Sequence, residues 1–141
     1  MTDFFDSIHG FKRAEFECSP DECGCGFSMV DIELLAVLMN VKQHFGRVLG
    51  YEATIIINSG CRCVAHNEVI QKRYNANYVP FSSNSQHLYG IASDFVVKDV
   101  HADDVADYLE AKYPDRYGIG RYNGRTHFDA KPGRARRWDS R

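Results

Sequence analysis

The stretch SQHLYGIASD, residues 85–94, joins a polar loop to an expected strand. Its apolar run continues to Val97 and predicts a short strand from residue 91 to residue 97. Successive side chains alternate between the two faces of a strand, so Asp94 lies on the face opposite Val97. Gly90 permits a tight turn just before the strand, and we therefore expect His87 to fold back beside Asp94.

A helix is expected well before this stretch. Apolar residues recur at steps of three and four from Ile32 to Phe45, which places them on one face of a helix. Ser28 and Asp31 suit its N-terminal turn, and Gly46 is its expected end.

The remaining elements follow from β-branched runs, helical spacing and turn residues. In chain order they are a buried strand at 53–58, a helix at 65–74, a polar loop at 75–85, a helix at 102–112 closed by Pro114, and two strands at 117–122 and 125–130. The last two strands are separated by Asn123-Gly124, a strong hairpin signal. Helices and short strands in this mixed order predict an α+β fold, with a small antiparallel or mixed sheet packed against helices.

Length and composition limit the number of domains and the classes of function that the chain can have. The 141 residues suit one domain, and we expect a single domain over 1–141, with an N-terminal extension over 1–15 and a basic tail over 131–141. A formal net charge of −2 argues against nucleic-acid binding by bulk charge. No apolar run approaches the roughly 18–20 residues of a membrane span, so we expect a soluble protein. The N-terminus lacks the pattern of a signal peptide, which favours synthesis in the cytoplasm.

The basic tail has two interpretations. Its five basic residues could contact anionic wall polymers or nucleic acid. We favour a solvated surface terminus anchored by Trp138.

Five cysteines are present, at positions 18, 23, 25, 61 and 63. An odd number without a signal-peptide pattern argues against a secreted disulfide framework. Two Cys-x-Cys pairs could present four thiolates to a structural zinc ion, although the usual spacing is Cys-x2-Cys or longer, and a redox or zinc-ribbon module is a related alternative. We prefer to interpret the cysteines as small, partly buried apolar residues with free thiols.

Three potential metal ligands stand out by their position. They are His87 and Asp94, which flank the turn into the strand at 91–97, and His127, which lies on the last expected strand. Two imidazoles and one carboxylate suit Zn²⁺, and three protein ligands leave a fourth position for water. The alternative is three unrelated polar residues.

Four segments resemble one family. SQHLYGIASD matches the pattern S-x-H-x-x-G-x-A-x-D of the D-Ala-D-Ala carboxypeptidase-like zinc peptidases (peptidase family M15), which include a vancomycin-resistance dipeptidase and phage endolysins. NSGCRC followed by His66-Asn67 is similar to the family's S-G-x-R…H-N segment. YGIGRYNGRTHFDAKPGRARRW is similar to its closing segment, and FECSPDECGCG to the cysteine-rich opening of phage and prophage members. The resemblance implies the fold shared by these peptidases and the hedgehog signalling domain.

The resemblance implies roles for six residues. His87, Asp94 and His127 would be the zinc ligands. Arg62 would contact the scissile carbonyl or its developing oxyanion, the alternative being a surface salt bridge. Ser85 would help to hold the substrate peptide, or would simply cap the loop before the strand. Asp129 would hold a ligand imidazole by its free N–H, the alternative being a solvated carboxylate.

The resemblance does not extend to the residue that acts as the general base in relatives. Better-known relatives carry an acidic residue three positions before the last ligand or a His two positions before it, where this chain has Gly124 and Arg125. Neither can accept a proton at neutral pH. The base would have to be Asp129, His66 or Glu68, or else the protein is a slow or inactive member.

The function implied is a zinc-dependent peptidase that hydrolyses peptidoglycan stem peptides, as a D,D-carboxypeptidase or an endopeptidase. A phage lysin that reaches the cell wall during lysis or in a virion fits the phage-type motifs. The alternative is a weak or inactive zinc-containing protein that binds peptidoglycan or is structural in a phage. Tyr74, Tyr78 and Phe81 in the long polar loop either line a substrate groove or pack the loop onto the domain.

Overall fold

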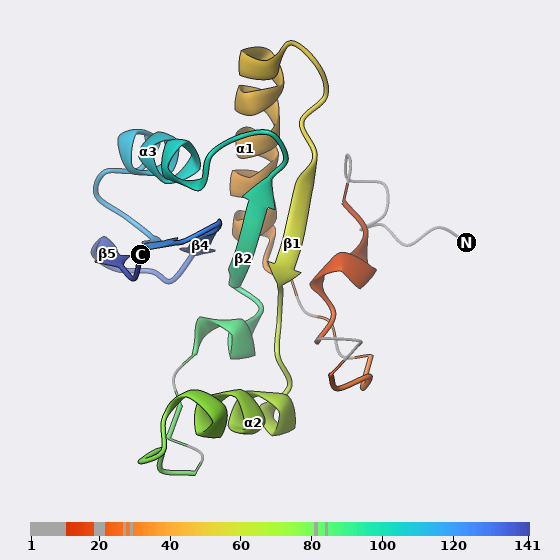
Figure 1. Ribbon diagram of the computed structural model, residues 1–141, viewed down its shortest axis with the longest axis vertical. Coiled ribbons are helices and arrows are strands. Elements are labelled where there is room, and N and C mark those ends of the chain that lie inside the picture. Colours follow the sequence, from red (N-terminus) through yellow and green to blue (C-terminus); the bar gives the residue numbers. More distant parts are fainter. Residues whose placement is uncertain (1–10, 19–21, 27, 29, 81, 84) are drawn as a thin grey trace.

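A computed structural model describes residues 11–18, 22–26, 28, 30–80, 82–83 and 85–141 (Figure 1). Its elements are the 3-10 helix η2 (Arg13–Phe16), α1 (Ile32–Leu49), β1 (Ile55–Ser59), α2 (Val64–Tyr74), the 3-10 helix η3 (Gln86–Tyr89), β2 (Ala92–Val97), α3 (Ala102–Lys112), β3 (Gly118–Tyr122), β4 (Arg125–Asp129) and β5 (Arg136–Asp139). The expected α+β class is confirmed. Residues 1–10 of the expected N-terminal extension, and Phe81, lie outside the described residues.

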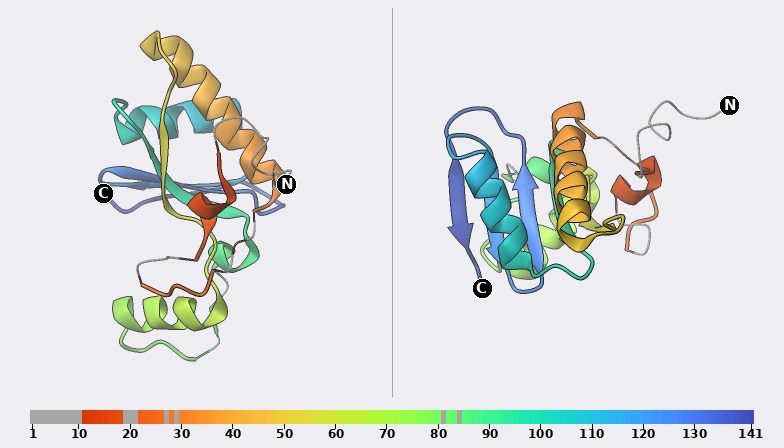
Figure 2. Two further views of the ribbon diagram at one scale, coloured as in Figure 1. Left: turned by 90° about the vertical axis from the view of Figure 1, so that its right-hand side faces the viewer. Right: turned by 90° about the horizontal axis from the view of Figure 1, so that it is seen from above.

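The strands form one mixed sheet in the order β1-β2-β4-β3-β5. The first four are antiparallel to their neighbours, and β5 runs parallel to β3. Figure 2 shows α1 and α3 on one side of the sheet and α2 and η3 on the other. The two faces of the sheet therefore have different surroundings, and alternation along each strand decides which residues meet which layer.

The hydrophobic core lies between the sheet and the pair α1 and α3. Phe95 of β2 and Phe128 of β4 are fully buried on this side, together with Leu38 of α1 and Leu109 of α3. Burying a large apolar side chain contributes about 1.5–3 kcal/mol, so this layer supplies most of the stabilisation of the sheet. The opposite face is left to polar side chains.

The helix α1 begins where the sequence predicts and ends later. Asp31 caps its N-terminus, because the Asp31 carboxylate accepts a hydrogen bond of 2.8 Å from the backbone N–H of Glu33. The expected end at Gly46 is wrong, since the helix continues to Leu49. It ends at Gly50, whose φ of 79° is the left-handed conformation that glycine adopts without steric cost.

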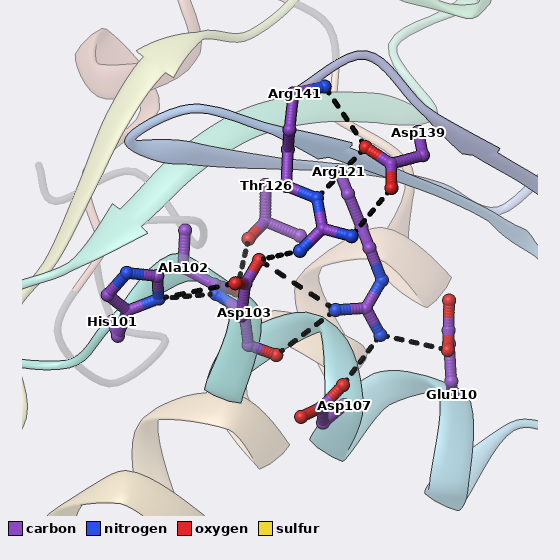
Figure 3. Close-up of polar contacts among 9 residues, drawn as sticks. All are labelled: His101, Ala102, Asp103, Asp107, Glu110, Arg121, Thr126, Asp139 and Arg141. Carbon is purple, nitrogen blue, oxygen red and sulfur yellow. Dashed lines mark hydrogen bonds and ion pairs between the residues drawn. The ribbon is translucent and has the colours of Figure 1, made fainter.

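On the core side of β3, an arginine joins the sheet to α3. Arg121 donates to Asp107 at 2.6 Å and to Glu110 at 3.0 Å, as Figure 3 shows. The Arg121 side chain is 15% exposed, but those of Asp107 and Glu110 are 67% and 36% exposed, so the ion pairs lie at the protein surface. They join α3 to β3.

The C-terminal segment differs from the expected solvated tail. Residues 136–139 are the edge strand β5, and Arg141 contacts Asp139 at 2.6 Å and Asp103 of α3 at 2.9 Å (Figure 3). The segment is therefore part of the sheet rather than a free terminus. Within the described residues, no helix combines the length and apolarity needed to cross a membrane.

Candidate metal centre

The turn before β2 carries the first expected ligand, His87. The 3-10 helix η3 ends at Gly90, whose φ of 67° lets the chain reverse into the strand. The His87 ring is buried, and its Nδ1 lies 2.5 Å from the carbonyl oxygen of Gly60. Because a carbonyl can only accept, Nδ1 carries the proton of the neutral ring, and the lone pair that a metal needs is on Nε2.

The other two expected ligands face each other across neighbouring strands. Asp94 of β2 is directly paired with His127 of β4, and the Asp94 Oδ1 atom lies 2.8 Å from His127 Nδ1. Asp94 Oδ2 lies 3.2 Å from His87 Nε2. One ligand atom from each of the three residues can be chosen so that all lie within 4.8 Å of one another. The structure thus brings together the three residues that the sequence singled out.

Hydrogen bonding sets the charge of this group. Burial alone would raise the pKa of Asp94, but its interactions with the His127 and His87 imidazoles outweigh burial and hold that pKa well below its usual range. Burial alone would lower the pKa of His127, yet its hydrogen bonds to Asp129 and Asp94 raise it above the ordinary value. The carboxylate is therefore ionised and ready to bind a cation.

Asp129 contacts the His127 ring at Nε2, the nitrogen that does not face Asp94. Its Oδ2 atom lies 2.9 Å from His127 Nε2, and its Oδ1 atom accepts from Arg136 of β5 and from the backbone N–H of Lys131. Asp129 is 1% exposed, so the alternative of a solvated strand carboxylate does not describe it. Gly118 leaves the space for this carboxylate, because a Cβ there would overlap it.

Trp138 covers the outer side of the same imidazole. Its ring centroid is 5.0 Å from that of His127, and its Nε1 donates to the Tyr122 hydroxyl at 2.9 Å. A Cβ on Gly120 would overlap the indole, so glycine is required where the ring crosses β3. Sequence reasoning missed the contacts of Arg136 and Trp138 with this site. The spacing Gly118-Ile119-Gly120 is a signal that could have found them, since glycines two residues apart clear one face of a strand.

A cavity of about 870 Å³ lies on this face of the sheet. All three expected ligands line it, and so do Arg62 and Ser85. Arg62 donates from Nη2 to the Ser85 hydroxyl at 3.2 Å, and its backbone N–H donates to the carbonyl of His87 at 2.9 Å. Burial lowers the pKa of Arg62 and the nearby Asp94 carboxylate opposes this, but a guanidinium remains charged at neutral pH. Ser85 precedes η3, and its side chain makes no capping hydrogen bond there.

The sequence comparison decides the family. A family model described as Peptidase M15 matches residues 9–129. The chain belongs to the peptidase M15 family. It is therefore related to hydrolases of peptide bonds that typically depend on a metal, and the His-Asp-His group offers a place for one. No curated protein and no solved structure matches the chain.

The structure separates the three base candidates of this M15 peptidase. Both carboxylate oxygens of Asp129 are already engaged. Glu68 accepts a hydrogen bond from the Tyr78 hydroxyl and does not line the cavity. His66 lines the cavity, and its Nε2 lies 3.5 Å from the Glu22 carboxylate.

The long loop of this peptidase contributes little to the cavity among its described residues. Tyr74, at the end of α2, lines the cavity and is 80% exposed. Tyr78 instead hydrogen-bonds Glu68 of α2, which packs the loop against the helix. Tyr74 therefore fits the interpretation as a groove-lining residue, and Tyr78 fits the interpretation as a residue that packs the loop onto the domain.

Proposed function

We propose that this M15 peptidase binds a zinc ion through His87, Asp94 and His127 and hydrolyses peptide bonds in the stem peptides of bacterial peptidoglycan. The observation that carries the proposal is that these three ligand groups converge in the wall of one cavity. Two imidazoles and a carboxylate are a donor set that zinc favours, and three protein ligands leave one coordination position open.

Arg62 supports the reaction class. A zinc ion bound at this site would supply a Lewis acid and activate water near neutral pH. Arg62 would donate to the oxygen of the scissile carbonyl as negative charge develops on it, and Ser85 would hold the guanidinium in position. The hydrogen bond between Arg62 and Ser85 supports this division of roles.

The charges of the cavity support an anionic peptide as substrate. Among the described residues, Arg62 and Arg125 of the cavity lining form no ion pair, and Arg125 lies over the Tyr122 ring at 4.3 Å from its centroid. The two other lining arginines are paired, Arg73 with Glu22 and Arg136 with Asp129. Peptidoglycan stem peptides carry free carboxylates, which the Arg125 guanidinium would bind while Arg62 contacts the scissile carbonyl.

His66 is the best-placed proton acceptor. It lines the cavity, and the Glu22 carboxylate beside it would stabilise the imidazolium after proton transfer. It would replace the acidic residue or His that better-known relatives carry at the positions of Gly124 and Arg125.

The proposal leaves two cleavage modes, a D,D-carboxypeptidase and an endopeptidase. As a phage-type lysin, the protein would act on the cell wall during host lysis or in a virion. The absence of a base at the positions of Gly124 and Arg125 favours a second candidate, a zinc-containing phage protein that binds peptidoglycan or is structural.

A muropeptide digest tests the proposal. The full chain is loaded with zinc and incubated with purified peptidoglycan, and the products are analysed by mass spectrometry and by the appearance of new amino termini. Release of terminal D-alanine would identify a carboxypeptidase, and loss of cross-linked muropeptides an endopeptidase. His87→Ala should abolish cleavage and lower the zinc content together. His44→Ala is the matched control, because His44 stacks on Tyr108 and lies outside the cavity.

Two outcomes would contradict the enzyme. Cleavage retained by His87→Ala would exclude the metal assignment. Stoichiometric zinc with no cleavage product, together with binding to peptidoglycan in a pull-down assay, would establish the second candidate instead.

A further inference from the structure

Four of the five cysteines gather into one cluster, although the sequence favoured separate free thiols. The cluster consists of Cys18, Cys23, Cys25 and Cys63, whose sulfur atoms all lie within 4.8 Å of one another. Cys18 follows η2, Cys23 and Cys25 lie in the next loop, and Cys63 is the N-cap residue of α2. The set is not the two Cys-x-Cys pairs suggested by spacing, because Cys18 joins it and Cys61 does not.

The sulfur separations are those of a metal site. Cys63 Sγ lies 3.7 Å from both Cys18 Sγ and Cys23 Sγ, and no disulfide joins the described cysteines. A disulfide requires about 2.05 Å. Four sulfurs placed tetrahedrally around a zinc ion at about 2.3 Å have edges of about 3.8 Å. The observed separations agree with the second arrangement.

Backbone donors already point at the sulfurs. The N–H of Cys63 donates to Cys18 Sγ at 3.4 Å, and the N–H of His66 donates to Cys63 Sγ at 3.3 Å. Four thiolates around Zn²⁺ carry a net charge of −2, which such donors and the N-terminus of α2 stabilise. Cys18 is fully buried, so a metal bound there would be partly shielded from water.

We propose that Cys18, Cys23, Cys25 and Cys63 bind a structural zinc ion, separate from the His-Asp-His site. Four protein ligands close the coordination sphere and leave no position for substrate, which distinguishes a structural from a catalytic site. The proposal goes beyond the hydrolase activity and stands whether or not the cavity cleaves peptidoglycan.

The zinc would fix one wall of the cavity. Cys63 directly follows Arg62, and Glu22, which contacts His66 and Arg73, directly precedes Cys23. Holding the cysteines together therefore holds Glu22 against α2 and Arg62 beside the His87 turn. This coupling gives the metal a role in shaping the cavity without contact with the substrate.

Metal analysis of the full chain tests the proposal without any activity measurement. Wild-type protein should contain two zinc ions per chain by native mass spectrometry and elemental analysis. His87→Ala and Cys63→Ser should each retain one. Cys61→Ser is the matched control, because Cys61 is a buried cysteine two residues away that lies outside the cluster, and it should retain two.

Spectroscopy on soluble protein covers the case in which a cysteine variant does not fold. In His87→Ala protein, X-ray absorption at the zinc edge should show a shell of sulfur only, at about 2.3 Å. Cobalt substituted for zinc in the same protein should give sulfur-to-metal charge-transfer absorption.

Several outcomes would overturn the proposal. One zinc per wild-type chain with only nitrogen and oxygen ligands would exclude the site, as would disulfides among these cysteines in freshly purified protein. Iron in place of zinc would exclude the assigned metal. Loss of zinc from Cys61→Ser but not from Cys63→Ser would exclude the assigned ligands. Failure of the muropeptide digest leaves each of these measurements intact, so the two proposals fail separately.

Discussion

Asp129→Asn tests whether the hydrogen bond between Asp129 and His127 strengthens metal binding at the His-Asp-His site. The substitution keeps the size of the side chain and removes its charge. In the native chain the Asp129 Oδ2 atom lies 2.9 Å from His127 Nε2, while Arg136 and the N–H of Lys131 occupy Oδ1. With Nε2–H bound in this way, Nδ1 of His127 is the atom left to face the metal, and that atom lies beside Asp94. The imidazole is thus held by a charge-assisted hydrogen bond.

The expected loss follows from that bond. A hydrogen bond to a charged group contributes about 1.5–3 kcal/mol and a neutral one about 0.5–1.5 kcal/mol. Replacing one by the other costs about 1–1.5 kcal/mol, and about 1.4 kcal/mol is a tenfold change in affinity. We therefore expect Asp129→Asn to weaken metal binding about tenfold, and Asp129→Ala to approach the roughly 100-fold upper range for such partners.

Cobalt titration measures this affinity at the correct site. Sulfur ligation adds charge-transfer absorption that imidazole and carboxylate ligation lack, so binding at the His-Asp-His group can be followed apart from binding at the cysteine cluster. Asp139→Asn is the matched control, since Asp139 is an exposed carboxylate of β5 that pairs with Arg141. It should bind cobalt with wild-type affinity.

An unchanged affinity in Asp129→Asn would refute the reasoning. It would mean that the contact between Asp129 and His127 does not orient the imidazole for metal binding. An equal loss in Asp139→Asn would also refute it, because the effect would then come from the general charge of the sheet edge.

Three further predictions concern other parts of the molecule. His66→Gln should lower kcat by about 100- to 10,000-fold at unchanged zinc content, and normal turnover would remove His66 as the base. Gly120→Ala should destabilise the fold by about 1–3 kcal/mol in urea unfolding, because the new Cβ overlaps the Trp138 ring; an unchanged midpoint would contradict that packing. Burial, aided by the hydrogen bond to Glu33, raises the pKa of Tyr117 to about 12. The folded state then holds this proton more tightly than the unfolded state, so stability falls between pH 10 and about 12, and Tyr117→Phe should reduce the fall measured by urea unfolding across that window.

Local patterns predicted the helices well because each signal is short in range. The helix α3 matches its expected bounds, 102–112, since its apolar spacing and Pro114 both act within a few residues. The end of α1 was predicted at the wrong glycine, because the sequence does not show whether a glycine lies inside a helix or ends it. Only the positive φ of Gly50 distinguishes it from Gly46.

The strand β5 could not be predicted from its local sequence. Its four residues are Arg136, Arg137, Trp138 and Asp139, which show no apolar alternation. As an edge strand it pairs only with β3, and its arginines find partners elsewhere in the fold. Arg137, for example, donates to the carbonyl oxygens of Tyr117 and Tyr113. Such contacts depend on tertiary structure and leave no periodic signal.

The two candidate metal sites, the His-Asp-His group and the cysteine cluster, could not be predicted equally well from the sequence. His87 and Asp94 are joined by one turn, and a family motif extends the set to His127. The contact between Cys18 and Cys63 spans 45 residues of sequence. Spacing between neighbouring cysteines carries no information about such a pairing.

Residues 60–63 connect the two groups through consecutive backbone contacts. The carbonyl of Gly60 accepts from His87, and the N–H of Cys61 donates to the carbonyl of Phe16 at 3.1 Å. The N–H of residue 62 donates back to the His87 carbonyl, and that of residue 63 donates to Cys18. The segment is therefore attached alternately to the His87 turn and to the N-terminal segment that carries the cysteines. A side chain at position 60 would overlap the Phe16 backbone, so the two sides are held close. Because these contacts are consecutive, we expect a change in the cysteine cluster to shift the backbone segment that carries Arg62 and contacts His87.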